Sequence, residues 1–214
     1  MSEIVKGALL SSCGKYRYWL SRQWSNLIAM HEPPLVFVML NPSIADHEVD
    51  DPTIRRCMGF AKREDARGMM VLNLFAARAT DPKELTAMED PIGPHNDSEI
   101  QRLLGDGYAT VICAWGANKF AKKRASEFLE NMAHRSLYCL GVTKDGSPRH
   151  PLYVPTDQPL EPYRIPADAH ICPCCRKSVF SELEHWSPDG WTSPGFFKCD
   201  SSEETEHEAQ EEQT

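Results

Sequence analysis

The sequence predicts an α/β fold with a mostly parallel central sheet. Short apolar runs recur between residues 35 and 141 of the 214-residue chain, and segments with helical periodicity separate them. Strands that alternate with helices form a parallel sheet whose two faces are covered by the helices. We therefore predict a three-layer sandwich with the sheet in the middle.

The predicted core strands lie at residues 35–40, 68–75, 108–116 and 136–141. The first, LVFVML, is an uninterrupted apolar run next to prolines, which is typical of a strand buried on both faces. Residues 11–24 mix aromatic and basic side chains with partial alternation, and this pattern predicts a further strand or hairpin.

Three longer helices, and a short one over 81–88, are predicted among these strands. One begins at Asp51, with Pro52 in its first turn and apolar residues at helical spacing after it. A second, over 95–107, begins at an Asn or Asp cap and ends at glycine. The third, over 118–133, is strongly amphipathic.

The carboxyl ends of the four predicted strands should meet at one edge of the sheet. The segments there are Asn41-Pro42-Ser43, Asn73-Leu74-Phe75, Trp115-Gly116 and the loop 141–155. Ligands of open α/β sheets bind beyond the carboxyl ends of the strands. The sequence therefore predicts a ligand site built from these four segments.

The motifs at this edge resemble those of known families. Leu40-Asn41-Pro42-Ser43 after the first core strand, Trp115-Gly116 after a later one and His150-Pro151-Leu152 after the last follow the motif order of the uracil-DNA glycosylase superfamily. The fuller pattern LNPSxADHxxDDPTIRR, with NLFAxRAT, WGAN and GxPRHPLY, is more closely similar to DUF1643, a bacterial and phage family of unknown function.

The superfamily resemblance implies a glycosylase-like fold and a DNA or nucleotide partner. It implies that Asn41 positions an attacking water, that His150 donates a hydrogen bond to the departing base, and that Phe75 stacks on that base. Such a donor stabilises developing charge, and the base must first leave the helical stack. The expected substrate-binding residues are Pro42, Ser43, Asn73, Phe75, Trp115, Gly116, Asn118, Lys144 and Arg149.

Each of these residues also has a purely structural interpretation. Asn41 precedes a proline and is typical of a turn. His150 would then be a loop histidine without a catalytic task, and Trp115 a core residue at a strand end. The sequence leaves both interpretations open.

The acidic segment after the first strand allows three interpretations. Asp50 or Asp51 caps the following helix, or a carboxylate, Asp46 or Asp51 foremost, acts as general base for water. Alternatively, carboxylates together with His47 bind a divalent metal and support hydrolysis.

Basic residues near the predicted edge are candidate phosphate contacts. Lys144 and Arg149 flank His150 and are the best placed. The remaining candidates, which also suit ordinary solvent-exposed helix faces, are Arg55, Arg56, Lys62, Arg63, Lys119, Lys122, Lys123 and Arg124.

The last quarter of the chain is rich in cysteine. Cys172 and Cys175 have the CxxC spacing of a zinc site, and His185 and Cys199 can complete four ligands to structural Zn(II). Reduced thiols are the alternative. We predict an α/β domain over 1–167, a small Cys-rich, ribbon-like appendage over 168–199 and a disordered acidic tail over 200–214.

Charge and hydropathy narrow the function classes. The net charge is −8, but seven acids lie in residues 200–214, so the rest of the chain is nearly neutral and does not exclude nucleic acid. The chain has neither an apolar run of membrane-spanning length nor a secretory signal, so we expect a cytoplasmic protein without a membrane partner.

These observations favour an enzyme that acts on a nucleobase or nucleotide, by base excision or within a DNA-modification pathway. A non-catalytic module that binds nucleic acid or protein is the first alternative. A metal-dependent hydrolase that uses Asp46, His47, Asp50 and Asp51 is the second.

Overall fold

The computed structural model describes residues 4–24, 34–43, 45, 48–105, 109–163, 169–171 and 178–180. The chain divides into two compact units, residues 1–165 and 166–214. The first unit contains a seven-stranded sheet, and in the second β8 (Ala169–Ile171) pairs antiparallel with β9 (Ser178–Phe180).

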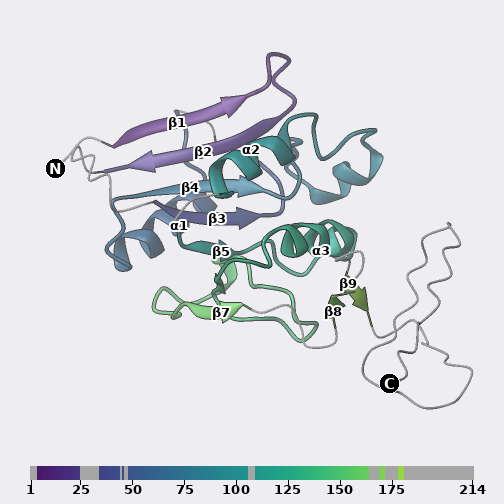
Figure 1. Ribbon diagram of the computed structural model, residues 1–214. Helices are drawn as coiled ribbons and strands as arrows, with labels where there is room; N and C mark the ends of the chain where they lie inside the picture. Colours follow the sequence, from purple (N-terminus) through teal and green to yellow (C-terminus); the bar gives the residue numbers. More distant parts are fainter. Residues whose placement is uncertain are drawn as a thin grey trace, which may run out of the picture. The chain divides into compact units, whose positions relative to one another are not determined.

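The strands of the large sheet lie in the order β1-β2-β4-β3-β5-β6-β7 (Figure 1). They are β1 (Val5–Leu10), β2 (Arg17–Gln23), β3 (Leu35–Met39), β4 (Gly68–Asn73), β5 (Val111–Cys113), β6 (Leu137–Cys139) and β7 (Glu161–Tyr163). The four central strands are parallel, whereas β1, β2 and β7 run antiparallel to their neighbours. The α/β prediction is confirmed, with a sheet that is mixed overall.

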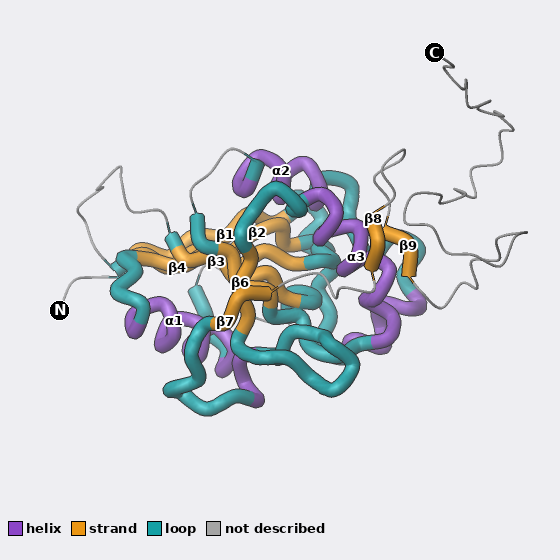
Figure 2. Tube along the Cα trace, turned by 60° about the horizontal axis from the view of Figure 1, so that its bottom comes forward, coloured by secondary structure: helices purple, strands orange, loops and turns teal. Residues whose placement is uncertain are grey.

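Helices cover both faces of this sheet. The helices are α1 (Pro52–Arg63), α2 (Asn96–Leu104) and α3 (Lys122–Asn131), and short 3₁₀ helices span Pro82–Ala87, Lys119–Ala121 and Pro151–Tyr153. Figure 2 shows α1 on one side of the strands and α2 and α3 on the other. The apolar side chains form two corresponding clusters, because successive residues of β3 point to opposite faces.

Helix α1 begins as the sequence predicts. The Asp51 side chain accepts a hydrogen bond from the Ile54 backbone N–H at 2.8 Å, and Pro52 occupies the first turn. Ile54, Cys57 and Phe60 are buried against the sheet. Of the two candidate caps, Asp51 is therefore the one that the helix uses.

The predicted cap of α2 is wrong. The residue before the helix is His95, whose side chain makes no capping hydrogen bond. Asn96 is instead fully buried inside the first turn, where its Nδ2 donates to the backbone carbonyls of Asn73 at 2.9 Å and Leu74 at 3.1 Å. This amide ties α2 to the end of β4.

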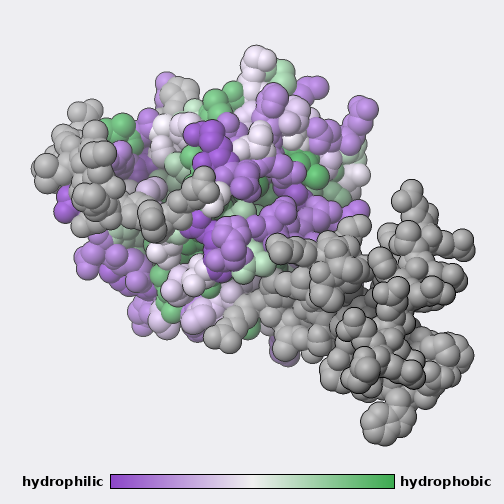
Figure 3. Space-filling model, in the orientation of Figure 1, coloured by the Kyte–Doolittle hydropathy of each residue, from purple (hydrophilic) through white to green (hydrophobic). Residues whose placement is uncertain are grey.

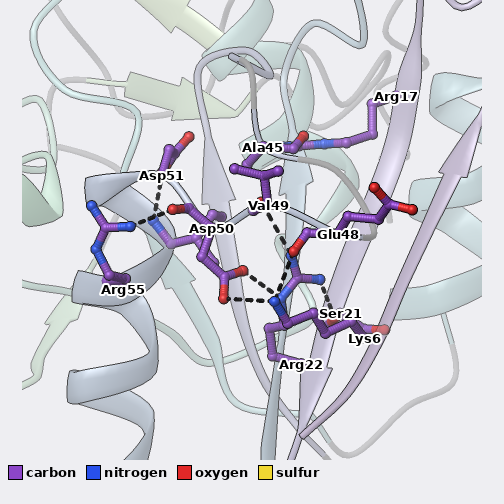
Figure 4. A network of polar contacts seen from close by, with 11 residues as sticks. Lys6, Arg17, Ser21, Arg22, Ala45, Glu48, Val49, Asp50, Asp51 and Arg55 are labelled. Carbon is purple, nitrogen blue, oxygen red and sulfur yellow. Dashed lines mark hydrogen bonds and ion pairs between the residues drawn. The ribbon is translucent and has the colours of Figure 1, made fainter.

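Two antiparallel strands anchor the acidic segment that precedes α1 (Figure 4). The side chain of Arg22 in β2 is fully buried, and its Nε lies 2.6 Å from Asp50 Oδ1. Lys6 in β1 lies 3.3 Å from the other oxygen of the same carboxylate. Asp50 therefore holds the loop after β3 against the outer strands.

The surface of the sheet unit is mostly polar on the face drawn in Figure 3, where hydrophobic residues are scattered between hydrophilic ones. None of the helices in the described ranges has the length and apolar content needed to cross a membrane.

We expect the Asp50 ion pair to contribute strongly to stability. Asp50→Ala leaves the buried Arg22 guanidinium without its carboxylate, so the free energy of unfolding should fall by about 3 kcal/mol, near the low end for breaking a buried ion pair because Asp50 is partly exposed. Urea denaturation measures this change. Asp157→Ala, at an exposed turn, is the control, and equal stability of the two variants would contradict the prediction.

Candidate functional site

A pocket of about 730 Å³ lies at the edge of the sheet where the parallel strands end. Its wall is formed by residues at or after the ends of β3, β4, β5 and β6, together with the first turn of α1. We call it the strand-end pocket. The predicted site residues that line it are Asn41, Ser43, Asp51, Asn73, Trp115, Gly116, Asn118, Lys144, Arg149 and His150.

Two predicted substrate-binding residues do not line this pocket. Pro42 is buried, and its carbonyl accepts hydrogen bonds from Asn41 Nδ2 and the Ala79 backbone N–H. Phe75 is also buried, and its ring stacks on Phe120 with 5.0 Å between the centroids. Pro42 thus helps to hold the Asn41 side chain, and Phe75 packs against another aromatic ring.

The Asn41 side chain has a fixed orientation. Its Nδ2 donates to the backbone carbonyls of Pro42 at 2.9 Å and Ala79 at 2.8 Å. Because a carbonyl can only accept, these bonds identify the nitrogen and leave Oδ1 as the free end of the amide. Oδ1 has no hydrogen-bond partner among the described residues, so it can accept a hydrogen bond from a ligand or water.

His150 presents a hydrogen-bond donor. Its Nδ1 accepts from the Leu152 backbone N–H at 3.3 Å, so the neutral ring carries its proton on Nε2. Burial lowers the pKa of His150, and the negative charge of Asp51 partly opposes this by raising it. The ring is therefore predominantly neutral at pH 7, with an N–H available for a ligand.

Gly116 lies where the Trp115 segment passes His150, and its backbone conformation favours glycine. Its φ of +75° belongs to the left-handed region, and a Cβ at this position would lie 3.5 Å from the Cβ of His150. The Trp115 indole is buried edge-on against Phe128 and Tyr163, and it also lines the pocket. Trp115 thus serves the core and the pocket wall together.

The acidic candidates have different positions. Asp51 is buried at the pocket, where one of its oxygens caps α1 and the other has no hydrogen-bond partner in the described part of the chain. Asp50 is held by Arg22 and Lys6. Asp46 and His47 lie outside the described residues. Within the described ranges, no three His, Cys, Asp or Glu side chains are grouped as metal ligands would be.

Arg17 is a pocket residue that the sequence did not indicate. It is 2% exposed, and its guanidinium donates to the Ala45 carbonyl at 2.7 Å and to Asn73 Oδ1 at 3.3 Å. Because β2 runs antiparallel to β4, the start of β2 lies beside the end of β4. The sequence around Arg17 carries no local pattern that indicates a pocket residue. The position of Arg17 could have been predicted only from the pairing of β2 with β4.

Asn73 is the most buried polar residue of the pocket wall, at 1% exposure. Its Oδ1 accepts from Arg17, which identifies Nδ2 as the other end of the amide. Nδ2 has no partner among the described groups. A buried donor without an acceptor costs roughly 1–3 kcal/mol, which makes it a candidate ligand contact.

Several residues predicted to contact phosphates instead bind backbone carbonyls or carboxylates of the protein itself. Arg56 donates to the carbonyls of Pro151 and Val154, and Arg63 to those of Thr156 and Gln158. Arg124 is buried and bonds Leu74 and Asp97. Arg55 donates to the Asp50 carbonyl. The side chains of α1 thereby hold the loop that carries His150.

The predicted zinc ligands Cys172, Cys175, His185 and Cys199 lie outside the described residues, so the zinc site stays a prediction. Of the other cysteines, Cys57, Cys113 and Cys139 are buried, whereas Cys13 is exposed. Burial raises the pKa of the Cys57 and Cys113 thiols, as expected for small apolar core residues.

We predict that Asp51→Asn lowers the pKa of His150 further. The substitution removes the negative charge that favours the imidazolium, while the amide oxygen can still cap α1. NMR titration of the histidine ring signals measures the shift. Asp157→Asn, at an exposed turn, should leave it unchanged, and a pKa of His150 that stays constant or rises in Asp51→Asn would refute the assignment.

Comparison with known proteins identifies a family. A family model described as a protein of unknown function, DUF1643, matches residues 17–152. No curated protein and no solved structure matches the chain. The matched range begins at Arg17 and includes every residue of the strand-end pocket except Tyr153. The chain belongs to the DUF1643 family.

Proposed function

We propose that this protein is an enzyme that acts on a nucleobase or nucleotide in the strand-end pocket, by glycosylase-like hydrolysis of the bond between base and sugar in DNA. One observation carries the proposal: the Asn41 acceptor and the His150 donor line the same pocket. Their hydrogen bonds to the backbone orient both groups before a substrate binds.

In the proposed reaction, Asn41 acts on the attacking water and His150 acts on the departing base. Asn41 Oδ1 accepts a hydrogen bond from a water, whose oxygen attacks the sugar carbon as the bond to the base breaks. The bonding electrons pass to the base, where His150 Nε2–H stabilises the negative charge that develops on a base oxygen. Asp51 is the candidate acceptor for the proton of the water, because one of its oxygens has no hydrogen-bond partner in the described ranges.

The dimensions and charges of the pocket support this substrate class. Its volume of about 730 Å³ lies within the range of small-molecule sites and leaves room for a nucleotide that has left the stack. Lys144 and Arg149 are exposed side chains on the wall and suit the flanking phosphates.

The fold also supports the proposal. Four parallel strands with helices on both faces, and motifs that follow the ends of these strands, are compatible with a three-layer, uracil-DNA glycosylase-like architecture. We propose that architecture for the sheet unit, with DNA as the partner.

The assay offers the protein single- and double-stranded oligonucleotides with uracil, thymine mismatches or modified pyrimidines, and measures strand cleavage at abasic sites. Asn41→Ala and His150→Ala should each lower the rate by about 100-fold or more. Asn131→Ala and His134→Ala are matched controls, because both residues are exposed and away from the pocket.

Two outcomes would refute the proposal. One is the absence of abasic product from every substrate, and the other is product formation that survives both pocket variants. DNA binding that weakens steeply with salt and is unaffected by Asn41→Ala, without any product, would instead identify the non-catalytic binding module.

A further inference from the structure

We propose that the rim of the strand-end pocket binds single-stranded DNA, with Tyr153 stacking on a base next to the nucleotide that enters the pocket. Tyr153 lines the pocket and is 80% exposed. Lys144 and Arg149 also line the pocket and are exposed, and we call these three residues the pocket rim. The rim deepens the proposed function by naming the form of the DNA, and it rests on that function for the choice of DNA.

The Tyr153 ring is available for a ligand. Its hydroxyl makes no hydrogen bond to the described residues, and the ring lies beside His150, tilted by 45° with 5.5 Å between the ring centroids. Trp115 also lines the pocket, but it is 5% exposed because it packs against Phe128 and Tyr163. An aromatic ring in water gives up the free energy of burial, and a nucleobase restores part of it by stacking on the ring.

The 3₁₀ helix Pro151–Tyr153 fixes the backbone that carries this ring. The Tyr153 backbone N–H donates to the His150 carbonyl at 3.0 Å. Pro151 is buried, and its carbonyl accepts a hydrogen bond from Arg56 Nε in helix α1 at 3.2 Å. The ring therefore has a defined place next to His150, and a base stacked on it lies next to a nucleotide that contacts His150.

Lys144 and Arg149 supply the positive charge that a DNA backbone attracts. Lys144 makes no hydrogen bond or ion pair with the described residues, so its ammonium group is free for a phosphate. Arg149 donates from Nε to the Val142 carbonyl at 3.1 Å, and its two terminal nitrogens have no partner in the described ranges. Asp145, an acid of the same loop, accepts a hydrogen bond from the Thr143 hydroxyl. An exposed aromatic ring next to free cations is typical of surfaces that bind single strands.

A single strand suits this rim better than a duplex. In a duplex both faces of each base are covered by its neighbours, so an aromatic side chain reaches a base only after the stack has opened. A single strand offers free base faces, and one of its nucleotides enters a pocket at a lower cost. Binding to a duplex also depends on many phosphate contacts. Among the described residues, Lys144 and Arg149 are the exposed cations that line the pocket.

Fluorescence anisotropy of the full chain with labelled oligothymidylate tests the rim. The single strand should bind about 10-fold more tightly than its duplex with oligoadenylate. Tyr153→Ala should weaken binding of the single strand about 10-fold, because the stacking on one base is lost. Tyr153→Phe keeps the ring and should retain the affinity, whereas Tyr153→Leu keeps apolar surface without a flat ring and should resemble Tyr153→Ala. His134→Ala, exposed and away from the pocket, is the control.

The salt dependence of binding separates the cations from the ring. Lys144→Ala removes one phosphate contact, so the slope of log K against log salt for the single strand should become shallower by about 0.7. Tyr153→Ala should leave this slope unchanged, because the ring contacts a base and no phosphate.

Three results would overturn the rim. The first is an affinity for the single strand that is the same in Tyr153→Ala and in the parent protein. The second is a Tyr153→Leu variant that binds as the parent does, or a Tyr153→Phe variant that binds as weakly as Tyr153→Ala, since either would exclude stacking. The third is equal affinity for single strand and duplex, or binding of neither.

The binding experiment is separate from base excision. Binding of the single strand that depends on Tyr153, without release of a base from any oligonucleotide, supports the rim and overturns the proposed function. Base excision by a protein whose affinity is unchanged in Tyr153→Ala supports the function and overturns the rim.

Discussion

The parallel pairing of β4, β3, β5 and β6 is the constraint on which the site depends. Met39 of β3 pairs with Asn73, Val38 with Cys113, and Cys113 with Cys139, so the four strands end at nearly the same level. The segment that follows each of these strands therefore leaves the sheet at that edge. The segments that follow the four strands surround the pocket. Its polar residues therefore come from parts of the chain that are far apart in sequence.

The antiparallel strands β1 and β2 contribute a residue to this edge of the sheet and hold the loop after β3 in place. Because β2 runs opposite to β4, its first residue, Arg17, lies at the pocket, while Arg22 farther along the strand binds Asp50. The segment after β3 is thus tied at Ala45 and at Asp50 to two arginines of one strand (Figure 4). Arg56 and Arg63, two of the candidate phosphate contacts, bind backbone carbonyls instead, so a basic residue close to this segment in sequence is not by itself evidence of a phosphate contact.

The sequence predicted the central strands and the shared edge, because long buried apolar runs and the helix signals at Asp51 and Pro52 are local properties. It did not predict β1 or β7, the two edge strands; VKGALL and EPY carry no clear alternation. It also predicted an Asn or Asp cap for α2, where Asn96 is buried in the first turn, and the family resemblance implied a base-stacking role for Phe75, which is buried against Phe120. The position of Arg17 at the pocket depends on the pairing of β2 with β4. This pairing is a property of the tertiary structure, and no local sequence pattern indicates it.

Two asparagines illustrate how the surroundings decide what a side chain offers. At Asn41, two backbone carbonyls take the amide nitrogen, so the oxygen is left for the pocket. At Asn73, a guanidinium takes the oxygen, so the nitrogen is left instead. The same residue type therefore supplies an acceptor in one part of the wall and a donor in another. A ligand that met both groups would have to present a donor to Asn41 and an acceptor to Asn73, and this requirement would restrict its orientation.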